Sequence, residues 1–294
     1  MSPPVFRFAP SPNGRLHLGH AASALCNAHF ASRMGGRMLL RIEDIDTARA
    51  RDVFVQGIQD DLHWLGIPFE MPVMRQYERF GFYAEALDKL SAQGLAYPCF
   101  CTRQSLLMRA SGHLRDHPRD PDGMPRYDGF CRHLPGATVA RRMAVGEPHA
   151  LRLKMDKALA HINTTMKHAP LSWAEGPPGT TPRLVPADAA AWGDAVIRRK
   201  EFPASYHIAV VVDDAAQGVT HVVRGLDLLR ATAIHRVLQM LLGLPGPQYH
   251  HHPLVWGDDG EKLSKSRNAP SLSDLRAAGV DASEVRRRAV LPDT

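Results

Sequence analysis

The sequence predicts an α/β fold with a Rossmann-type doubly wound parallel sheet that carries an inserted module. Its 294 residues, 44% of them apolar, suffice for one large α/β domain with a small insertion. Residues 5–10 and 37–42 are apolar enough for short buried strands, and the Ala-rich segment 21–33 between them has helical character. Such a β-α-β opening unit is typical of a parallel sheet. From residue 97 to about 142 the chain becomes polar and rich in proline, which indicates the insertion.

Helical spacing of apolar residues continues the opening unit. Segments 52–65 and 80–93 have this spacing, and Gly66 and Gly94 stand just past their ends, where a glycine commonly closes a helix. A nucleotide should then bind at the carboxyl ends of the strands, near the first strand-to-helix turn.

Apolar runs and glycines divide the second half of the chain into further elements. We expect a fully buried strand at residues 206–213, a second strand at 218–224 and a long helix at 226–242. A strand at 253–256 should lead into a lysine-containing loop, and residues 272–289 should form a helical tail. The Pro/Gly-rich span 171–191 is predicted as an exposed loop.

The composition indicates the compartment and the kind of partner. Lys and Arg exceed Asp and Glu by six (36 against 30), which favours an anionic partner. No apolar run approaches the ~20 residues of a membrane span, and the N-terminus lacks the basic start and apolar core of a signal peptide. We therefore expect a cytoplasmic protein without a membrane partner.

Two short segments far apart in the chain carry groups suited to phosphate binding. His17-Leu18-Gly19-His20 opens the first predicted helix, where backbone N–H groups attract phosphate, and its two imidazoles can donate to one polyphosphate. Lys262-Leu263-Ser264-Lys265-Ser266 places two ammonium groups on a loop. Together they would stabilise the charge that develops when a carboxylate attacks the α-phosphate of ATP and pyrophosphate leaves. The alternative is that the histidines cap a helix and the lysines belong to a solvated loop.

Three of the four cysteines lie in the proline-rich insert and suggest a metal. Cys99, Cys101 and Cys131 are accompanied there by Tyr127 and His133, and tetrahedral zinc prefers thiolate and imidazole ligands. A structural zinc would make a segment without a hydrophobic core rigid. The alternative is three buried free thiols. Chemistry alone favours His133 over Tyr127 as the fourth ligand, because a phenolate must first lose a proton of pKa ~10.

Two arginines stand at the ends of predicted apolar strands. Arg7 and Arg224 are costly there unless each meets an anion. A planar guanidinium holds a carboxylate through two parallel hydrogen bonds, so the pair suits a substrate with a side-chain carboxylate.

The histidine and lysine segments, in this order, resemble the HIGH and KMSKS signatures of class I aminoacyl-tRNA synthetases. The flanking residues resemble the glutamyl branch of that class at positions 7–12, 40–46, 211–214 and 221–225. Only residues 267–294 follow the lysine segment, so we expect no anticodon-binding domain. That organisation resembles the glutamyl-Q tRNA(Asp) synthetase family, whose members are truncated relatives of glutamyl-tRNA synthetase.

The resemblance implies a division of the chain into three parts. Residues 1–96 form the first half of the nucleotide-binding catalytic domain, and residues 97–195 form an inserted acceptor-binding-like module with the zinc site. Residues 196–294 form the second half, with the lysine loop and a short helical tail.

The resemblance also implies roles for individual residues. The residues expected to be catalytic are His17, His20, Lys262 and Lys265, and those expected to bind ATP are His17, Gly19, His20 and Lys265. The residues expected to line a glutamate pocket are Arg7, Phe8, Ala9, Pro10, Ser11, Glu43, Tyr206 and Arg224. Within the pocket, Arg7, Tyr206 and Arg224 would take the side-chain carboxylate, whereas Ser11 and Glu43 would take the α-amino group. The alternative for Glu43 is a salt bridge with Arg41 or Arg49.

For the metal, the pattern of the truncated family matches Cys99, Cys101, Tyr127 and Cys131. Some full-length glutamyl enzymes instead close the site with a Cys-x-His pair, which matches Cys131 and His133. We expect Tyr127 as the fourth ligand.

The implied function is activation of glutamate by ATP without tRNA, followed by transfer to the queuosine base in the anticodon of tRNA(Asp). The implied cofactors are a structural zinc and ATP with Mg²⁺ as substrate. The implied partner is the anticodon stem-loop, and a monomer is expected. The alternatives are a truncated synthetase that charges the 3′ end of tRNA(Glu), another HIGH-type nucleotidyltransferase, and a non-catalytic RNA-binding paralogue.

Overall fold

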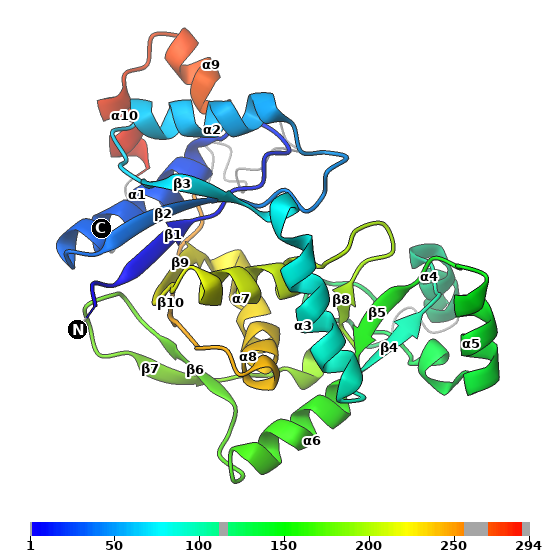
Figure 1. Ribbon diagram of the computed structural model, residues 1–294. Coiled ribbons are helices and arrows are strands. Elements are labelled where there is room, and N and C mark those ends of the chain that lie inside the picture. Colours follow the sequence, from blue (N-terminus) through cyan, green and yellow to red (C-terminus); the bar gives the residue numbers. More distant parts are fainter. Residues whose placement is uncertain (1, 112–116, 256–269, 290–294) are drawn as a thin grey trace.

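Two groups of strands meet side by side to form the centre of the molecule (Figure 1). The computed structural model describes residues 2–111, 117–255 and 270–289. Parallel strands β1 (Val5–Phe8), β2 (Arg37–Ile42) and β3 (Glu70–Arg75) form the first group. In the second group, β9 (His221–Gly225) and β6 (Ser172–Glu175) both run parallel to the intervening β10 (Gln248–His252), and β6 forms an antiparallel hairpin with β7 (Arg183–Pro186).

The two groups are joined along β1 and β9. The backbone N–H of Thr220, just before β9, donates to the carbonyl of Val5 at 3.0 Å. The strand order across the sheet is therefore β3-β2-β1-β9-β10. From β1 the chain adds β2 and β3 on one side, and it later adds β9 and β10 on the other, so the strand order reverses between β1 and β9. In open parallel sheets, ligands bind at such a switch point, at the carboxyl ends of the strands.

Helices cover both faces of this sheet, and each face has its own apolar core. One face is covered by α1 (Leu18–Arg33), α2 (Asp52–Trp64), α9 (Leu272–Ala277) and α10 (Ala282–Arg288). The opposite face is covered by α3 (Phe80–Ala92), α6 (Met155–Thr165), α7 (Tyr206–Ala216) and α8 (Ala231–Leu242). This arrangement confirms the predicted α/β fold with a parallel sheet.

Alternation along the strands decides which side chains face which core. Phe6 and Leu40 belong to the α1 core, whereas Val5 and Leu39 belong to the core under α3, α7 and α8. Because successive strand residues point to opposite faces, Arg7 lies on the same face as Val5. Arg7 thus faces α7, which carries its partner Asp214.

A smaller antiparallel sheet stands beside the main one. It contains β4 (Ala96–Cys99), β5 (Ala150–Leu153) and β8 (Val196–Arg198) in that order, with α4 (Arg103–Ser111) and α5 (Gly136–Ala144) beyond it. Short 3₁₀ helices span Gln76–Arg79, Phe130–His133, Ala190–Trp192 and Leu226–Leu228. The predicted boundaries at residues 97 and 195 do not coincide with these sheets, because β6 and β7 pair in the main sheet and β8 in the small one.

The first elements follow the sequence prediction closely. Helix α1 begins at Leu18 rather than at residue 21, because His17 caps it. Gly66 and Gly94 have φ of 65° and 67°, the left-handed conformation expected of residues that close α2 and α3.

Three predictions for the second half were wrong. Residues 206–213 form the start of helix α7 rather than a strand. Ser205 caps this helix, and packing against α3 and α8 buries apolar residues on more than one face of it. Residues 171–191 are not an exposed loop, because β6 pairs with β10 and Trp173 is buried. The described residues 253–255 form no strand: β10 ends at His252, since Pro253 has no N–H to donate, and Trp256 lies outside the described residues.

Candidate active site

A cavity of about 560 Å³ opens at the switch point between β1 and β9. Every described residue predicted to bind glutamate or ATP lies in its wall. These residues are Arg7, Phe8, Ala9, Pro10, Ser11, His17, Gly19, His20, Glu43, Tyr206 and Arg224. Lys262 and Lys265 lie outside the described residues, so their predicted roles stay predictions.

Mutual capping by two histidines forms the N-terminus of α1. Nδ1 of His17 accepts from the backbone N–H of Gly19, and the backbone N–H of His17 donates to Nδ1 of His20, both at 3.1 Å. The ring centroids are 3.8 Å apart. With both Nδ1 atoms acting as acceptors, the proton of each neutral ring lies on Nε2. The capping role therefore prepares two donors at the cavity wall and does not exclude phosphate binding.

Gly19 is the residue that allows the His17 ring to fold back over the first turn. A Cβ atom at position 19 would lie 3.0 Å from Cε1 and 3.2 Å from Nδ1 of that ring. Any side chain here would press on the ring that caps the helix.

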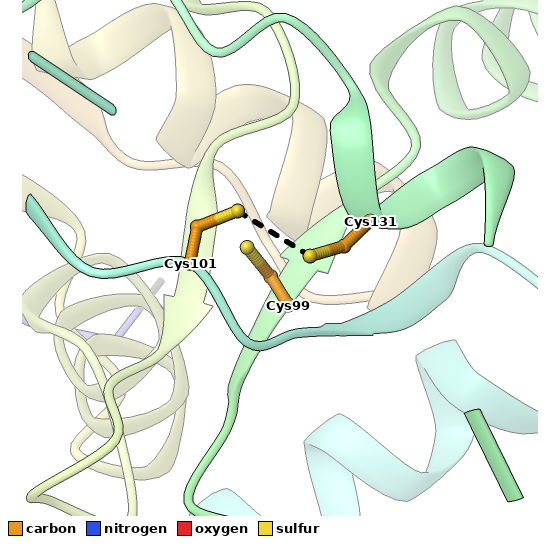
Figure 2. Close-up of side chains that lie close together, drawn as sticks. All are labelled: Cys99, Cys101 and Cys131. Atoms are coloured by element: carbon orange, nitrogen blue, oxygen red, sulfur yellow. Dashed lines mark hydrogen bonds between the residues drawn. The ribbon is translucent and has the colours of Figure 1, made fainter. Parts of the chain in front are cut away.

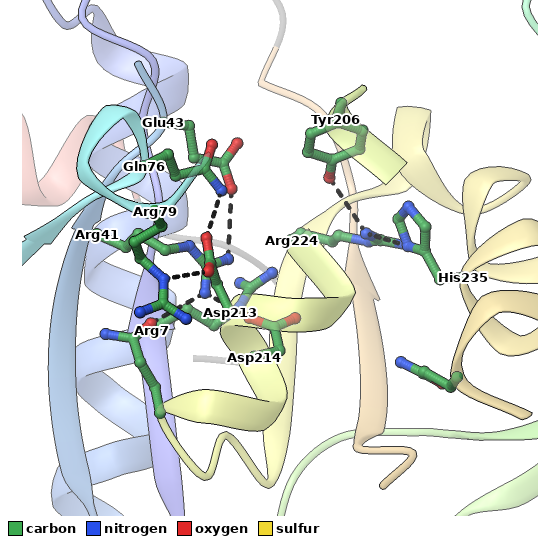
Figure 3. A network of polar contacts seen from close by, with 12 residues as sticks. Arg7, Arg41, Glu43, Gln76, Arg79, Tyr206, Asp213, Asp214, Arg224 and His235 are labelled. Carbon is green, nitrogen blue, oxygen red and sulfur yellow. Dashed lines mark hydrogen bonds and ion pairs between the residues drawn. The ribbon is translucent and has the colours of Figure 1, made fainter. Parts of the chain in front are cut away.

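Arg7 enters the cavity from β1 with its charge already paired. Its Nε donates to Asp214 of α7 at 3.1 Å, and Nη1 of Arg41 donates to the same carboxylate oxygen at 2.7 Å (Figure 3). Burial acts to raise the pKa of Asp214, but Arg7 and Arg41 together hold it below its usual value. Arg41 also forms an ion pair with Glu43 at 3.3 Å, so the salt bridge considered for Glu43 exists and Glu43 still lines the cavity.

Asp213, the neighbour of Asp214, ties α7 to the region around α3. Its two carboxylate oxygens accept from Arg79 at 2.6 Å, from the Tyr83 hydroxyl at 2.7 Å and from Gln76 at 2.8 Å. The side chain is fully buried. Asp213 thereby fixes the helix that carries both Asp214 and Tyr206.

Arg224 enters from β9 and has a different environment. Its guanidinium donates to Nε2 of His251 at 3.1 Å, to the Thr232 hydroxyl at 2.8 Å and to the Leu228 carbonyl at 3.1 Å. Nη1 reaches Nδ1 of His235 at 3.3 Å and the Tyr206 hydroxyl at 3.4 Å. Within the described part of the chain, no carboxylate forms an ion pair with it.

The buried partners of Arg7 and Arg224 were not among the predicted site residues. These partners are Asp214, Thr232, His235 and His251, and Asp213 precedes Asp214 on α7. The Asp pair at the end of an apolar run was a visible signal, because such carboxylates require cations. Thr232, His235 and His251 carried no comparable signal in sequence.

Three cysteines converge at the edge of the small sheet. The sulfur atoms of Cys99, Cys101 and Cys131 lie within 4.8 Å of one another and point together (Figure 2). The Tyr127 hydroxyl lies 3.4 Å from the sulfur of Cys99 and 3.6 Å from that of Cys101. His133 is exposed on the following 3₁₀ helix.

Hydrogen bonds favour the thiolate form of one cysteine of the cluster. Burial acts to raise the pKa of the Cys101 thiol, but hydrogen bonds with Tyr127, Cys131 and Arg109 together lower it. Burial raises the pKa of Tyr127, so its hydroxyl ionises only with strong assistance. The three thiols could supply three of the four ligands of a closed structural zinc site, and the Tyr127 hydroxyl is the polar group that lies beside them.

The fold and the cleft at the switch point agree with comparison to known proteins. Residues 5–290 match the family described as tRNA synthetases class I (E and Q), catalytic domain. The chain belongs to this family and is a ligase that forms an aminoacyl-adenylate. None of its described helices combines the length and apolarity that crossing a membrane demands.

Relatives with a more specific name match nearly the whole chain. The glutamyl-Q tRNA(Asp) synthetase of Rhodobacter capsulatus is 46% identical over 96% of this chain and 98% of its own length. That of Symbiobacterium thermophilum is 40% identical over 95% and 83%. The glutamate–tRNA ligase of Aquifex aeolicus is 38% identical over 95% of this chain but only 55% of its own. The resemblance to glutamyl-Q synthetases predicted from the sequence is confirmed.

Solved structures show the same fold. A glutamate tRNA ligase from Elizabethkingia meningosepticum in complex with its amino acid aligns over 90% of this chain, with a TM-score of 0.70 and 28% identity. The chain spans about half of that protein, 52%. A Mycobacterium tuberculosis methionyl-tRNA synthetase bound to methionyl-adenylate, 16% identical, aligns with a TM-score of 0.57 and shares the fold.

Proposed function

We propose that the protein activates glutamate with ATP in the absence of tRNA and transfers it to the queuosine base in the anticodon of tRNA(Asp). The observation that carries this proposal is one cavity whose wall contains two guanidinium groups and the two imidazoles that cap α1. The choice of acceptor is supported by similarity to glutamyl-Q tRNA(Asp) synthetases along nearly their full length.

In the amino-acid half of the cavity, Arg7, Tyr206 and Arg224 bind the side-chain carboxylate of glutamate. Ser11 and Glu43 bind its α-ammonium group. Burial raises the pKa of Glu43, and an ammonium ion beside it favours the ionised carboxylate. The α-carboxylate then faces the nucleotide half of the cavity.

In the nucleotide half, His17 and His20 donate through Nε2 to phosphate oxygens of ATP, which enters with Mg²⁺. An oxygen of the α-carboxylate attacks the α-phosphorus, and the bond from phosphorus to the bridging oxygen of pyrophosphate breaks. Lys265 neutralises charge on the departing pyrophosphate, and Lys262 orders its loop. A hydroxyl of the queuosine cyclopentene ring then attacks the glutamyl carbonyl carbon and gives up its proton to water. The bond from that carbon to the phosphate oxygen breaks, and AMP leaves with the electron pair.

In the small sheet, Cys99, Cys101, Tyr127 and Cys131 hold a structural zinc. Such a metal crosslinks strand β4 to the 3₁₀ helix at 130–133 and stabilises the insert without taking part in the chemistry.

Transfer of labelled glutamate to defined RNAs tests the choice of acceptor. Queuosine-containing tRNA(Asp) should accept glutamate with or without its 3′-terminal adenosine, and so should its isolated anticodon stem-loop. The same tRNA without queuosine, and tRNA(Glu), should not. Charging of tRNA(Glu) that disappears when its terminal adenosine is removed would establish the alternative, a synthetase acting at the 3′ end.

A further inference from the structure

Arg224 donates to buried neutral acceptors, and one of them, the His251 ring, is hydrogen-bonded in turn to the carboxylate of Glu175. We propose that Glu175 and His251 are positioning residues that hold Arg224 through a neutral acceptor and so keep its positive charge available for the substrate carboxylate. This inference rests on the proposed binding of glutamate by Arg224.

The hydrogen-bond partners determine the state of His251. The carboxylate of Glu175 accepts from the backbone N–H of His251 at 3.0 Å and lies 2.9 Å from Nδ1 of its ring. Since an ionised carboxylate only accepts, Nδ1 carries the proton. On the other side of the ring, Nε2 faces Nε of Arg224 at 3.1 Å and the Thr232 hydroxyl at 3.2 Å. Because a guanidinium only donates, Nε2 is the acceptor and the ring is neutral.

The electrostatics of this arrangement agree with the geometry. Burial lowers the pKa of His251, and Arg224 adds to this, although Glu175 acts in the opposite direction. Burial acts to raise the pKa of Glu175, but its bonds to His251 and Trp173 hold it below its usual value. The carboxylate and the imidazole therefore coexist as an anion and a neutral ring.

A second neutral ring supports Arg224 from α8. Nη1 of Arg224 donates to Nδ1 of His235, which places the proton of His235 on Nε2, 3.2 Å from Nδ1 of His207. Burial and the charge of Arg224 hold the pKa of His235 well below its usual value and that of His207 at about 4. Both imidazole partners of Arg224 are thus acceptors without charge.

The contrast with Arg7 defines the consequence. Asp214 neutralises Arg7 directly, whereas Arg224 is linked to the carboxylate of Glu175 through the His251 ring. A carboxylate on the substrate can neutralise the charge of Arg224, whereas an uncharged amide cannot. Glu175 and His251 therefore act on affinity and selectivity for glutamate and leave the ATP half of the cavity unchanged.

Glu175→Gln tests this role with a minimal change of shape. A glutamine amide can donate to Nδ1, which moves the ring proton to Nε2, where it opposes the guanidinium. In glutamate-dependent ATP–pyrophosphate exchange we expect KM for glutamate to rise about tenfold, with kcat and KM for ATP changed less than about threefold. The preference for glutamate over glutamine should fall by a similar factor. Asp194→Asn, which alters an equally buried carboxylate bound to Tyr97, is the matched control and should change none of these values.

Thr232→Val provides a second variant in case Glu175→Gln fails to fold. It removes the hydroxyl between Arg224 and His251 with almost no change in volume, and KM for glutamate should again rise while kcat is retained. If both variants match the Asp194→Asn control in KM for glutamate, the positioning role is wrong. If the unmodified protein itself shows no glutamate-dependent exchange, the proposed function fails, and this inference fails with it.

Discussion

Arg7 and Arg224 show how the acceptors of one residue type change its chemistry. Arg7 donates to the ionised Asp214, which is shared with Arg41, and both of these arginines are almost completely buried. Arg224 is buried to the same degree, but its acceptors are neutral. A buried guanidinium whose described partners are all neutral is costly, so its presence here favours a substrate that supplies the missing charge.

Replacing Arg224 with glutamine should therefore change the choice of substrate. We expect kcat/KM for glutamate in pyrophosphate exchange to fall by at least about a hundredfold, near 3 kcal/mol, because a buried charge-assisted contact is lost. Activity with glutamine should fall far less. Arg236→Gln, which alters a neighbouring arginine bonded to the Ser172 carbonyl, serves as control and should keep wild-type selectivity. Equal losses with both amino acids would contradict the assignment of Arg224.

Gly19→Ala should separate catalysis from stability. The added methyl group would press on the His17 ring at 3.0 Å and weaken the cap by about 1 kcal/mol, while alanine in place of glycine favours the helix by a similar amount. We expect an unchanged melting temperature and a KM for ATP raised at least about fivefold, since the ring edge that meets phosphate is displaced. Gly57→Ala in α2, where the nearest atom is 3.7 Å away, should raise stability and leave KM for ATP unchanged. Normal ATP kinetics in Gly19→Ala would contradict this role of the His17 ring.

Among the elements, those with a polar face or a clear boundary could be predicted from the sequence. Helices α2 and α3 have both. Helix α7 misled the prediction because residues 208–212 are apolar and largely β-branched and lie between α3 and α8, so no periodic polar face exists. Strand β10 was not predicted because its sequence Gln-Tyr-His-His-His is mostly polar. It nevertheless forms a buried strand between β6 and β9.

The small sheet supplies a prediction about metal. Protein purified without chelators should contain one zinc per chain, and Cys101→Ser should lose it and unfold the insert, because a structural site contributes directly to folding. Elemental analysis checks the stoichiometry. Tyr127→Phe should release zinc and His133→Ala should not, since only the tyrosine lies among the sulfur atoms. Zinc loss in His133→Ala alone would contradict the choice of Tyr127.

The carboxyl group of Asp61, at the contact between α2 and α9, opposes folding at neutral pH. Asp61 is 2% exposed, and burial raises its pKa to about 6, although Arg276 and Arg15 act in the opposite direction. The folded protein therefore retains this proton up to about pH 6, whereas the unfolded chain releases it near pH 4. The unfolded state binds fewer protons between these values, so stability falls as pH rises through this window.

Asp61→Asn should remove this penalty. We expect the variant to be more stable than the wild type by up to about 3 kcal/mol at pH 8, from two pKa units at about 1.4 kcal/mol each, and equally stable near pH 4. Urea unfolding at both pH values measures the difference. Asp60→Asn, on the exposed side of the same helix, should show no such pH dependence. A constant difference for Asp61→Asn would show that its carboxyl is not perturbed.

At the scale of the whole molecule, the position of the site could be predicted but its inner support could not. The β-α-β opening and the signature residues place ligands at the first strand-to-helix turn, and the cavity lies there. The pairing of Arg7 with Asp214 joins residues 207 positions apart, and that of His251 with Glu175 joins residues 76 apart. Such contacts depend on how α7 and β10 pack against the first strands, which local sequence patterns do not encode.

The cleft between β1 and β9 should activate glutamate without RNA. Glutamate-dependent ATP–pyrophosphate exchange in RNA-free protein tests it most directly, because the reaction requires both halves of the cavity and no acceptor. We predict exchange that depends on glutamate, is at least about a hundredfold weaker with glutamine, and requires no added tRNA. Exchange that appears only when tRNA is added, or equal exchange with glutamine, would contradict the account.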